Sequence, residues 1–208
     1  MKEDKIIPAL IELDRPREFQ KEELKNIKYT HRPEVHYSHY GNRGCVDLVT
    51  TMEYEFNGQT RKREAVYEIK SDNAIRHSTG ANEIIRQYNK HRKYFYKDDS
   101  NEIPYDLRFE LVFIPTELSV KHVLENIEIY HGASSMKAYG ADGSGMYTDN
   151  IVFRSTSKEH QQPFSPTPTE YRDNFKNPET LLQDLQDIGD PIHYEMYELL
   201  LSVMESDD

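Results

Sequence analysis

Two runs rich in β-branched and aromatic residues flank a short turn signal in the first third of the chain. The runs are CVDLVTTMEYEF (45–56) and QTRKREAVYEIK (59–70), and the residues between them are Asn57 and Gly58. An Asn-Gly pair between two such runs is the strongest short-range signal for a β-hairpin with a two-residue loop. The pattern therefore predicts two antiparallel strands in a defined register.

That register determines which side chains meet at the open end of the hairpin. Phe56 would pair with Gln59, and counting back along both strands places Asp47 opposite Glu68. Side chains alternate along a strand, so Glu68 and Lys70 share one face. Two carboxylates at cross-strand distance repel each other unless something neutralises them. We expect either a divalent cation here or, as the simpler alternative, a solvated hairpin face with a chance acidic pair.

A cation bound to these carboxylates would be Mg²⁺ or Mn²⁺ rather than Zn²⁺. Hard oxygen ligands that leave room for water and a phosphate oxygen suit these two ions. Lys70 would hold an attacking water or offset the charge that develops at phosphorus. With such a cation bound, the three side chains would suit hydrolysis of a phosphate ester.

The periodicity of the remaining residues predicts a sheet with helices on both sides. The strand at 107–115 has a nearly continuous apolar centre, which is typical of a strand covered on both faces. The other expected elements are a helix from Asp14 to about Tyr29, a strand at 34–40, a helix from about Gly80, a helical segment at 117–130, a flexible loop at 131–150 and a short closing strand at 150–154.

A proline-rich stretch divides the chain. PFSPTPTEY (163–171) has three prolines in six residues, which opposes regular structure. We therefore expect a core domain at residues 1–162, followed by a linker and a helical tail at residues 163–208. The tail holds 11 acidic and 2 basic residues, whereas the core holds 26 acidic and 24 basic residues, so −9 of the net charge of −11 belongs to the tail. One hypothesis is that this tail competes with nucleic acid for a basic region of the core.

Two short helices are predicted within the tail. Asn177-Pro178 and Asp190-Pro191 each place a capping residue before a proline in the first helical turn. The second helix carries an apolar stripe that would dock on the core or on a second subunit, so a homodimer through these helices is possible. The stripe consists of Ile192, Met196, Leu199, Leu200 and Val203.

The composition fits a soluble protein, with 36% hydrophobic and 30% charged residues. No apolar run approaches the roughly 20 residues that a membrane helix needs, and the N-terminus lacks the pattern of a signal peptide. We therefore expect a cytoplasmic protein with no membrane partner. Cys45 is the single cysteine, which excludes an internal disulfide and a four-cysteine cluster.

The local charge favours a nucleic-acid partner although the whole chain is acidic. Residues 58–97 hold 10 Lys or Arg and 4 Asp or Glu, a local excess of +6 that we expect to surround the metal site. A phosphate backbone would lie there, with an ordinary charged helix face as the alternative. The side chains expected to contact phosphates are Arg76, Arg86, Lys90 and Arg92.

The stretch GCVDLV, the hairpin, YEIK and the helix that follows resemble the PD-(D/E)XK nuclease superfamily over roughly residues 15–115. The resemblance implies a restriction-endonuclease-like α/β sandwich with a mixed central β-sheet flanked by helices. It also implies that Asp47 and Glu68 are ligands of a catalytic metal. Lys70 would be the catalytic lysine, and the backbone carbonyl of Ile69 would be a further ligand.

The resemblance assigns roles on two helices as well. Members of the superfamily often place a glutamate near the metal from the helix before the catalytic strands, and Glu23, on one stripe with Phe19 and Ile27, would take that role unless it is a solvated border residue. Recombination-type members project a glutamine, and a tyrosine four residues later, toward the site. Gln87 matches this glutamine and would reach the scissile phosphate, or else face solvent. His91 stands at the tyrosine position, where we expect a structural histidine rather than a general base.

These features together predict a metal-dependent nuclease that hydrolyses phosphodiester bonds in DNA, with RNA not excluded. Asp47, Glu68, Lys70 and Gln87 are the expected catalytic residues. Val46 stands where the name of the motif has proline. The alternative, from another class, is a non-catalytic nucleic-acid or protein interaction module on a nuclease-like scaffold.

Overall fold

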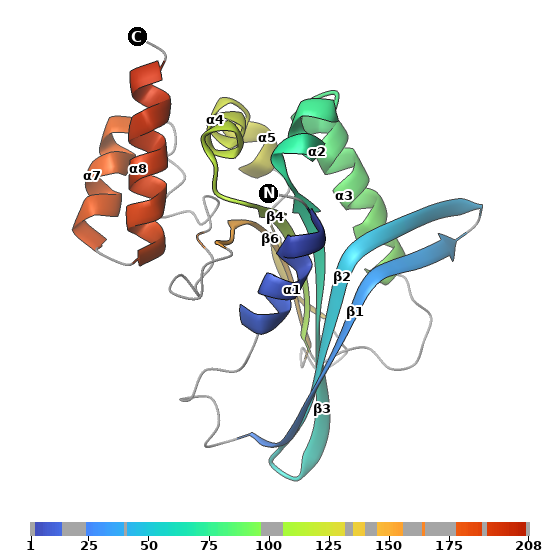
Figure 1. Ribbon diagram of the computed structural model, residues 1–208. Coiled ribbons are helices and arrows are strands. Elements are labelled where there is room, and N and C mark those ends of the chain that lie inside the picture. The colour runs from blue at the N-terminus through green and yellow to red at the C-terminus, as the bar shows by residue number, and fades with distance from the viewer. Residues whose placement is uncertain are drawn as a thin grey trace.

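The computed structural model describes residues 3–13, 24–39, 41–96, 106–131, 135–139, 145–155, 164, 178–188 and 191–206. Within these residues, six strands form one mixed sheet in the order β1-β2-β3-β4-β6-β5 (Figure 1). The strands are β1 (Lys25–His39), β2 (Asn42–Phe56), β3 (Gln59–Lys70), β4 (Asp106–Phe113), β5 (Ser135–Tyr139) and β6 (Gly145–Phe153). The β3–β4 and β4–β6 pairs are parallel, and the other pairs are antiparallel.

Helices cover both faces of this sheet. The helices among the described residues are α1 (Glu3–Leu13), α2 (Asp72–His77), α3 (Ala81–Tyr96), α4 (Glu117–Glu125), α5 (Ile127–His131), α7 (Pro178–Ile188) and α8 (Pro191–Ser206). Helices α3, α4 and α5 pack on one face and α1 packs on the other (Figure 1). None of the described helices is long and apolar enough to cross a lipid bilayer. The predicted sheet with helices on both sides is confirmed.

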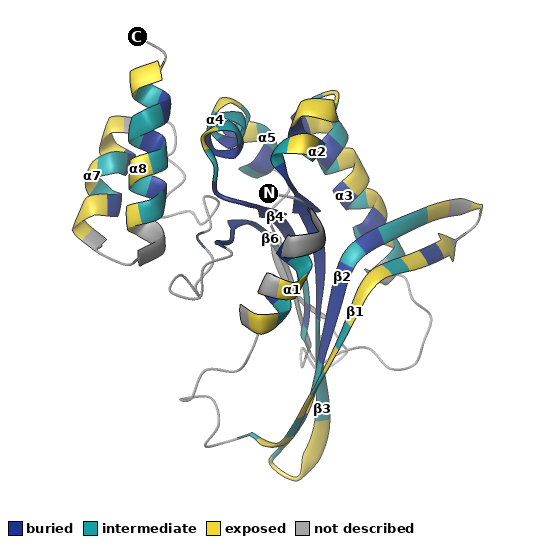
Figure 2. Cartoon of the chain, in the orientation of Figure 1, coloured by how far each residue is buried: buried dark blue, intermediate teal, exposed yellow. Residues whose placement is uncertain are grey.

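The alternation of side chains along the strands produces two apolar layers. In β4, Phe109 and Leu111 pack under the layer of α3, α4 and α5, whereas Val112 packs against Ile6 and Leu10 of α1. Figure 2 shows that the middle of the sheet is buried and that the hairpin turn between β2 and β3 is exposed. Polar groups placed in the buried middle must therefore find partners within the protein.

Asn57 and Gly58 form the tight turn between β2 and β3, as predicted. Their φ angles are 50° and 75°, and two positive φ angles are what a type I′ hairpin turn requires. The pairing begins at Phe56 with Gln59 and continues without a shift to Leu48 with Tyr67. The predicted register of the hairpin is confirmed over this length.

The predicted helix at residues 14–29 is wrong in its second part. Residues 25–39 form β1, and Lys28 pairs with Glu53 of β2. The apolar residues in this part of the chain are spaced as in a helix, but the pairing of β1 along the whole of β2 outweighs this local preference for a helix. The strand expected at 34–40 is the end of this longer strand. Residues 14–23, including Glu23, lie outside the described residues.

The loop expected at residues 131–150 contains β5 and the first part of β6. The many small residues of this segment give a weak strand signal. These strands are instead stabilised by the pairing of β5 with β6 and of β6 with β4. Helix α1 was not predicted either, because Pro8 lies inside it and weakens the helical signal. The helix after Gly80, the strand at 107–115, the helical segment at 117–130 and the two C-terminal helices are confirmed.

The C-terminal helices pack on the core through the predicted apolar stripe. Met196, Leu200 and Val203 of α8 are buried in the same apolar cluster as the inner face of α4. Ser202 of α8 also donates a hydrogen bond of 2.6 Å to the carboxylate of Glu117 in α4. Helix α8 therefore docks beside α4, and Figure 1 shows α7 and α8 on the opposite side of α4 from α3.

Leu200→Ala should lower the free energy of unfolding by about 2–5 kcal/mol, because it leaves a cavity under α8. Leu200 is 1% exposed, whereas Tyr194 on the same helix is 53% exposed and provides the control. Tyr194→Ala should change the free energy by less than about 0.5 kcal/mol. Urea unfolding followed by circular dichroism measures both. Equal and small effects would contradict the packing of α8 on the core.

Candidate active site

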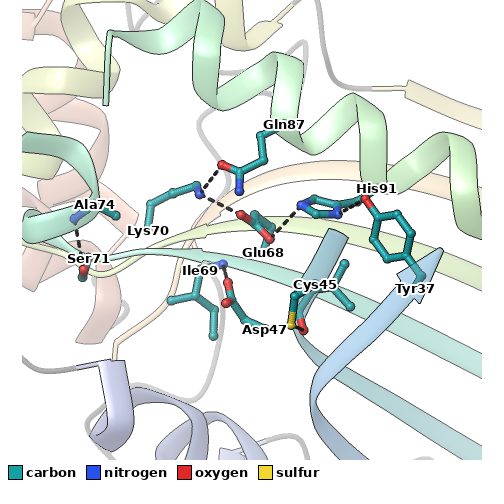
Figure 3. Close-up of polar contacts among 11 residues, drawn as sticks. Tyr37, Cys45, Asp47, Glu68, Ile69, Lys70, Ser71, Ala74, Gln87 and His91 are labelled. Carbon is teal, nitrogen blue, oxygen red and sulfur yellow. Dashed lines mark hydrogen bonds and ion pairs between the residues drawn. The ribbon is translucent and has the colours of Figure 1, made fainter. Parts of the chain in front are cut away.

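The end of β3 places two charged side chains under α3. Val66 lies on the face of the sheet that α3, α4 and α5 cover, and Glu68 and Lys70 follow it at two-residue spacing. Because β3 lies between β2 and β4, both residues are buried, with exposed fractions of 4% for Glu68 and 7% for Lys70. Lys70 Nζ donates a hydrogen bond of 2.7 Å to Glu68 Oε1, which makes a buried ion pair (Figure 3).

Asp47 reaches the same place from β2. It directly precedes Leu48, the β2 residue of the last hairpin pair counted from the turn, and its side chain is partly buried. Asp47 Oδ2 accepts a hydrogen bond of 2.6 Å from the backbone N–H of Ile69, which lies between Glu68 and Lys70 in β3 (Figure 3). The structure thus brings the two acidic residues and the lysine together at one end of the hairpin.

Helix α3 adds two polar side chains to this cluster. Lys70 Nζ also donates to Gln87 Oε1 at 3.1 Å. One turn later, His91 Nε2 lies 3.4 Å from Glu68 Oε2. The Glu68 carboxylate therefore lies between the Lys70 ammonium on one oxygen and the His91 ring on the other (Figure 3).

Tyr37 of β1 continues this series of contacts. Its hydroxyl oxygen lies 2.7 Å from His91 Nδ1. Burial, with a contribution from the charge of Glu68, raises the pKa of Tyr37 to about 12. Burial, with contributions from the nearby lysine charges, lowers the pKa of His91 to about 4. Near pH 7 the Tyr37 phenol is therefore protonated and the His91 imidazole is neutral.

The four basic residues expected at the phosphates lie on α2 and α3. Arg76 is exposed on α2, and Arg86 and Lys90 are exposed on α3. The residues of α3 have partners within the chain: Arg86 bonds Glu83 at 2.6 Å, Lys90 Nζ donates to the backbone oxygen of Arg43 at 2.5 Å, and Arg92 donates to Asn89 at 2.9 Å. Gln87 lies on the same helix, so this side of α3 adjoins the cluster around Lys70.

The expectation that the whole local charge excess surrounds the site is wrong. Arg61, Lys62 and Arg63 lie on β3 close to the turn, and seven residues separate Arg61 from Glu68. At 3.3 Å per residue this is about 23 Å. Three of the ten basic residues therefore lie near the turn end of β3, away from Glu68 and Lys70, because the strand is extended.

The oxygen donors in this cluster fit a hard divalent cation. Asp47 and Glu68 supply carboxylates from neighbouring strands, and the carbonyl of Ile69 belongs to the same strand end. No group of three His, Cys, Asp or Glu side chains suited to a metal occurs among the described residues, which do not include Glu23. Mg²⁺ is commonly held by one or two carboxylates together with water and substrate phosphate. Two carboxylates therefore suffice for such a site.

A family model for the PD-(D/E)XK nuclease superfamily domain matches residues 1–149. The chain belongs to the PD-(D/E)XK nuclease superfamily. The predicted family is thus confirmed, and the mixed sheet with flanking helices is the restriction-endonuclease-like α/β fold that the resemblance implied. Comparison with curated proteins and with solved structures gave no match.

Membership in the PD-(D/E)XK superfamily indicates the general chemistry of this protein. Nucleases of the superfamily hydrolyse phosphodiester bonds of nucleic acids and generally use divalent metal ions. The match extends through β5 into β6, beyond the roughly 100 residues that carry the sequence resemblance. The strands at that edge therefore belong to the family domain.

Sequence reasoning missed Tyr37 in this PD-(D/E)XK domain. The alternation in EVHYSHY (34–40) places Tyr37 on the same side of the strand as Val35, which only suggests that both are buried. Its partner His91 lies 54 residues later in the chain. No local pattern links the two residues, because their contact depends on how β1 passes beside α3.

Proposed function

We propose that this protein is a metal-dependent nuclease that hydrolyses phosphodiester bonds in DNA. The observation that carries the proposal is the buried Glu68–Lys70 ion pair beside Asp47. Such a pair is weak support for stability, because replacing a buried pair by well-packed apolar residues is often neutral or stabilising by about 1–4 kcal/mol. Desolvated charges gathered in this way are typical of catalytic sites.

Each residue of the cluster has a distinct proposed role. Asp47 and Glu68 would hold Mg²⁺ or Mn²⁺, with the backbone carbonyl of Ile69 as a further ligand. The bound cation would polarise the scissile phosphate and lower the pKa of the attacking water. Lys70, held between Glu68 and Gln87, would orient that water and offset the charge that develops on the phosphate oxygens. Gln87, which is exposed, would contact the phosphate itself.

The proposed substrate is DNA, held by basic residues of α2 and α3. Arg86 and Lys90 lie on the helix that presents Gln87, and both are exposed. The partner of Arg86 is Glu83 at the surface, and an exposed ion pair is worth only about 0–1 kcal/mol, so a phosphate can replace it.

Asp47→Asn, Glu68→Gln and Lys70→Met should each reduce cleavage by about 100-fold or more. The two amide variants keep an acceptor for the Ile69 N–H and for the Lys70 ammonium, so they remove charge with little change of shape. Both should also weaken Mn²⁺ binding, whereas Lys70→Met should leave it largely intact. Calorimetric titration with Mn²⁺ and assays on plasmid, linear and branched DNA measure these effects. Removal of metal with EDTA should abolish cleavage.

Glu53→Gln is the matched control, because Glu53 is an exposed carboxylate on the same strand as Asp47. It should retain cleavage and Mn²⁺ affinity. Unchanged Mn²⁺ affinity in both Asp47→Asn and Glu68→Gln would refute the assignment of the metal site. Binding of nucleic acid without metal-dependent cleavage would support the alternative of a non-catalytic interaction module.

Replacing Arg86 and Lys90 together by alanine should make DNA binding less sensitive to salt. The slope of log affinity against log salt concentration changes by about 0.9 for each phosphate contact that is lost. Fluorescence anisotropy with labelled duplexes, in the inactive Glu68→Gln background, measures the slope between 50 and roughly 200 mM salt. The same titration with RNA tests the preference for DNA.

Lys25 and Lys28 provide the control for this titration. Both are exposed on β1. They pair with Glu55 and Glu53, near the turn end of β2 and far from the cluster around Lys70. Replacing both by alanine should leave the slope unchanged. If the Arg86/Lys90 variant and the Lys25/Lys28 variant lower the salt dependence of DNA affinity equally, α3 has no special part in binding the phosphate backbone.

A further inference from the structure

We propose that Tyr37, acting through His91, is a positioning residue for Glu68, and that Gly44 provides the space which this arrangement needs. The inference rests on the proposed function, in which Glu68 is a metal ligand. It assigns a role to β1, the strand at the edge of the described sheet, which carries none of the motif residues. The resemblance to the superfamily assigned no role to either Tyr37 or Gly44.

The contacts run without interruption from β1 to the Glu68 carboxylate. The Tyr37 hydroxyl lies 2.7 Å from His91 Nδ1, and His91 Nε2 lies 3.4 Å from Glu68 Oε2 (Figure 3). Tyr37, His91 and Glu68 are 6%, 3% and 4% exposed. Because Lys70 bonds the other carboxylate oxygen at 2.7 Å, both oxygens of Glu68 have a defined neighbour. The orientation of this carboxylate is therefore set by residues from three different elements.

A phenol that donates and an imidazole that accepts give this series of contacts a direction. The Tyr37 phenol keeps its proton near pH 7, so its hydroxyl donates to His91 Nδ1. A ring that accepts this hydrogen bond at Nδ1 carries its proton on Nε2, the nitrogen that faces Glu68. At 3.4 Å this N–H contact is longer than an ordinary hydrogen bond, so Oε2 is oriented while keeping its capacity to bind a cation. Without the Tyr37 hydroxyl, the ring can place its proton on either nitrogen.

Gly44 is what allows the Tyr37 ring to occupy this position. The two residues are cross-strand partners in β1 and β2. A Cβ atom on Gly44 would lie 2.2 Å from both Cζ and the hydroxyl oxygen of Tyr37. Gly44 is not among the residues with positive φ, so the need for glycine comes from this close approach and not from the backbone. Any other residue at this position would displace the Tyr37 ring.

The ring is also held from the side of α3. Tyr37 stacks on Tyr94 with 4.2 Å between ring centroids and meets the His91 ring edge-on at 5.5 Å. Lys90, also on α3, donates to the backbone oxygen of Arg43, next to Gly44 in β2. The β1–β2 pair and α3 are thus joined at the point where the contact with Glu68 begins.

Tyr37→Phe tests the role of the hydroxyl, because it keeps the ring and its stacking. The Mn²⁺ dissociation constant of the metal-free chain should rise about tenfold, as is typical when an outer partner of a metal ligand is lost. Tyr29→Phe is the matched control on the same strand, since the Tyr29 hydroxyl bonds Met52 Sδ and lies outside this series of contacts. It should leave the dissociation constant unchanged. Calorimetric titration measures the affinity, and melting temperatures show that each variant is folded.

A double-mutant cycle tests whether Tyr37 acts through His91. His91→Leu should also weaken Mn²⁺ binding, and adding Tyr37→Phe to it should have no further effect. His91→Gln keeps an N–H donor near the position of Nε2 and should retain most of the affinity that His91→Leu loses. A merely structural role of the tyrosine predicts equal effects of Tyr37→Phe in both backgrounds, and that result would overturn the proposal.

Gly44→Ala gives a second and independent test. It keeps every polar group and should raise the Mn²⁺ dissociation constant about as much as Tyr37→Phe does, because it displaces the ring. In a Tyr37→Ala background, Gly44→Ala should cost nothing further. Unchanged affinity in both Tyr37→Phe and Gly44→Ala, with affinity lost in Glu68→Gln, overturns the positioning role alone. Unchanged affinity in Glu68→Gln overturns the metal site itself, and the positioning role with it.

Discussion

The antiparallel pairing of β2 with β3 is the constraint on which the site depends. A slip of one residue would turn Glu68 and Lys70 away from α3 and toward the face that α1 covers. The turn excludes this slip, because Asn57 and Gly58 both adopt the positive φ angles of a two-residue hairpin loop. Parallel pairing with β4 along residues 63–70 then holds the end of β3 inside the sheet. The contacts of the Glu68 carboxylate with Lys70 and His91 both require this register.

The parts of the site that were predictable are those that local rules determine. Turn chemistry and the alternation of side chains suffice to bring Asp47 to the end of β3, and a helical pattern after the hairpin suffices to place Gln87 above it. The contact of Tyr37 with His91 depends on packing between elements distant in the chain, for which the sequence has no local signal. The start of β1 was misread for the same reason, because its pairing with β2 outweighs the local spacing of apolar residues.

Two buried acidic residues of the sheet show how a structural ion pair differs from the proposed catalytic one. Glu110 receives Arg108 at 3.0 Å on one oxygen and Arg154 at 2.8 Å on the other. Burial alone would raise the pKa of Glu110, but the two arginines hold it below its usual value. The Glu68 carboxylate contacts the Lys70 ammonium at 2.7 Å on one oxygen and the His91 ring at 3.4 Å on the other. Glu110 is therefore held by two guanidinium groups, as in a structural ion pair, whereas the Glu68 carboxylate contacts an ammonium and an imidazole in the cluster proposed to bind a cation.

The strand that supplies Tyr37 is also the edge of the described sheet, and its 15 residues present a long row of backbone groups. Such an edge invites pairing with a strand of another molecule. Pro33 has no N–H to offer a new neighbour, and Glu34, with a φ angle of 50°, bends the backbone out of a continuous ladder. Lys28 and Arg32 add exposed charge along the same strand. The strand thus protects the sheet against edge-to-edge aggregation while its inner face serves the site.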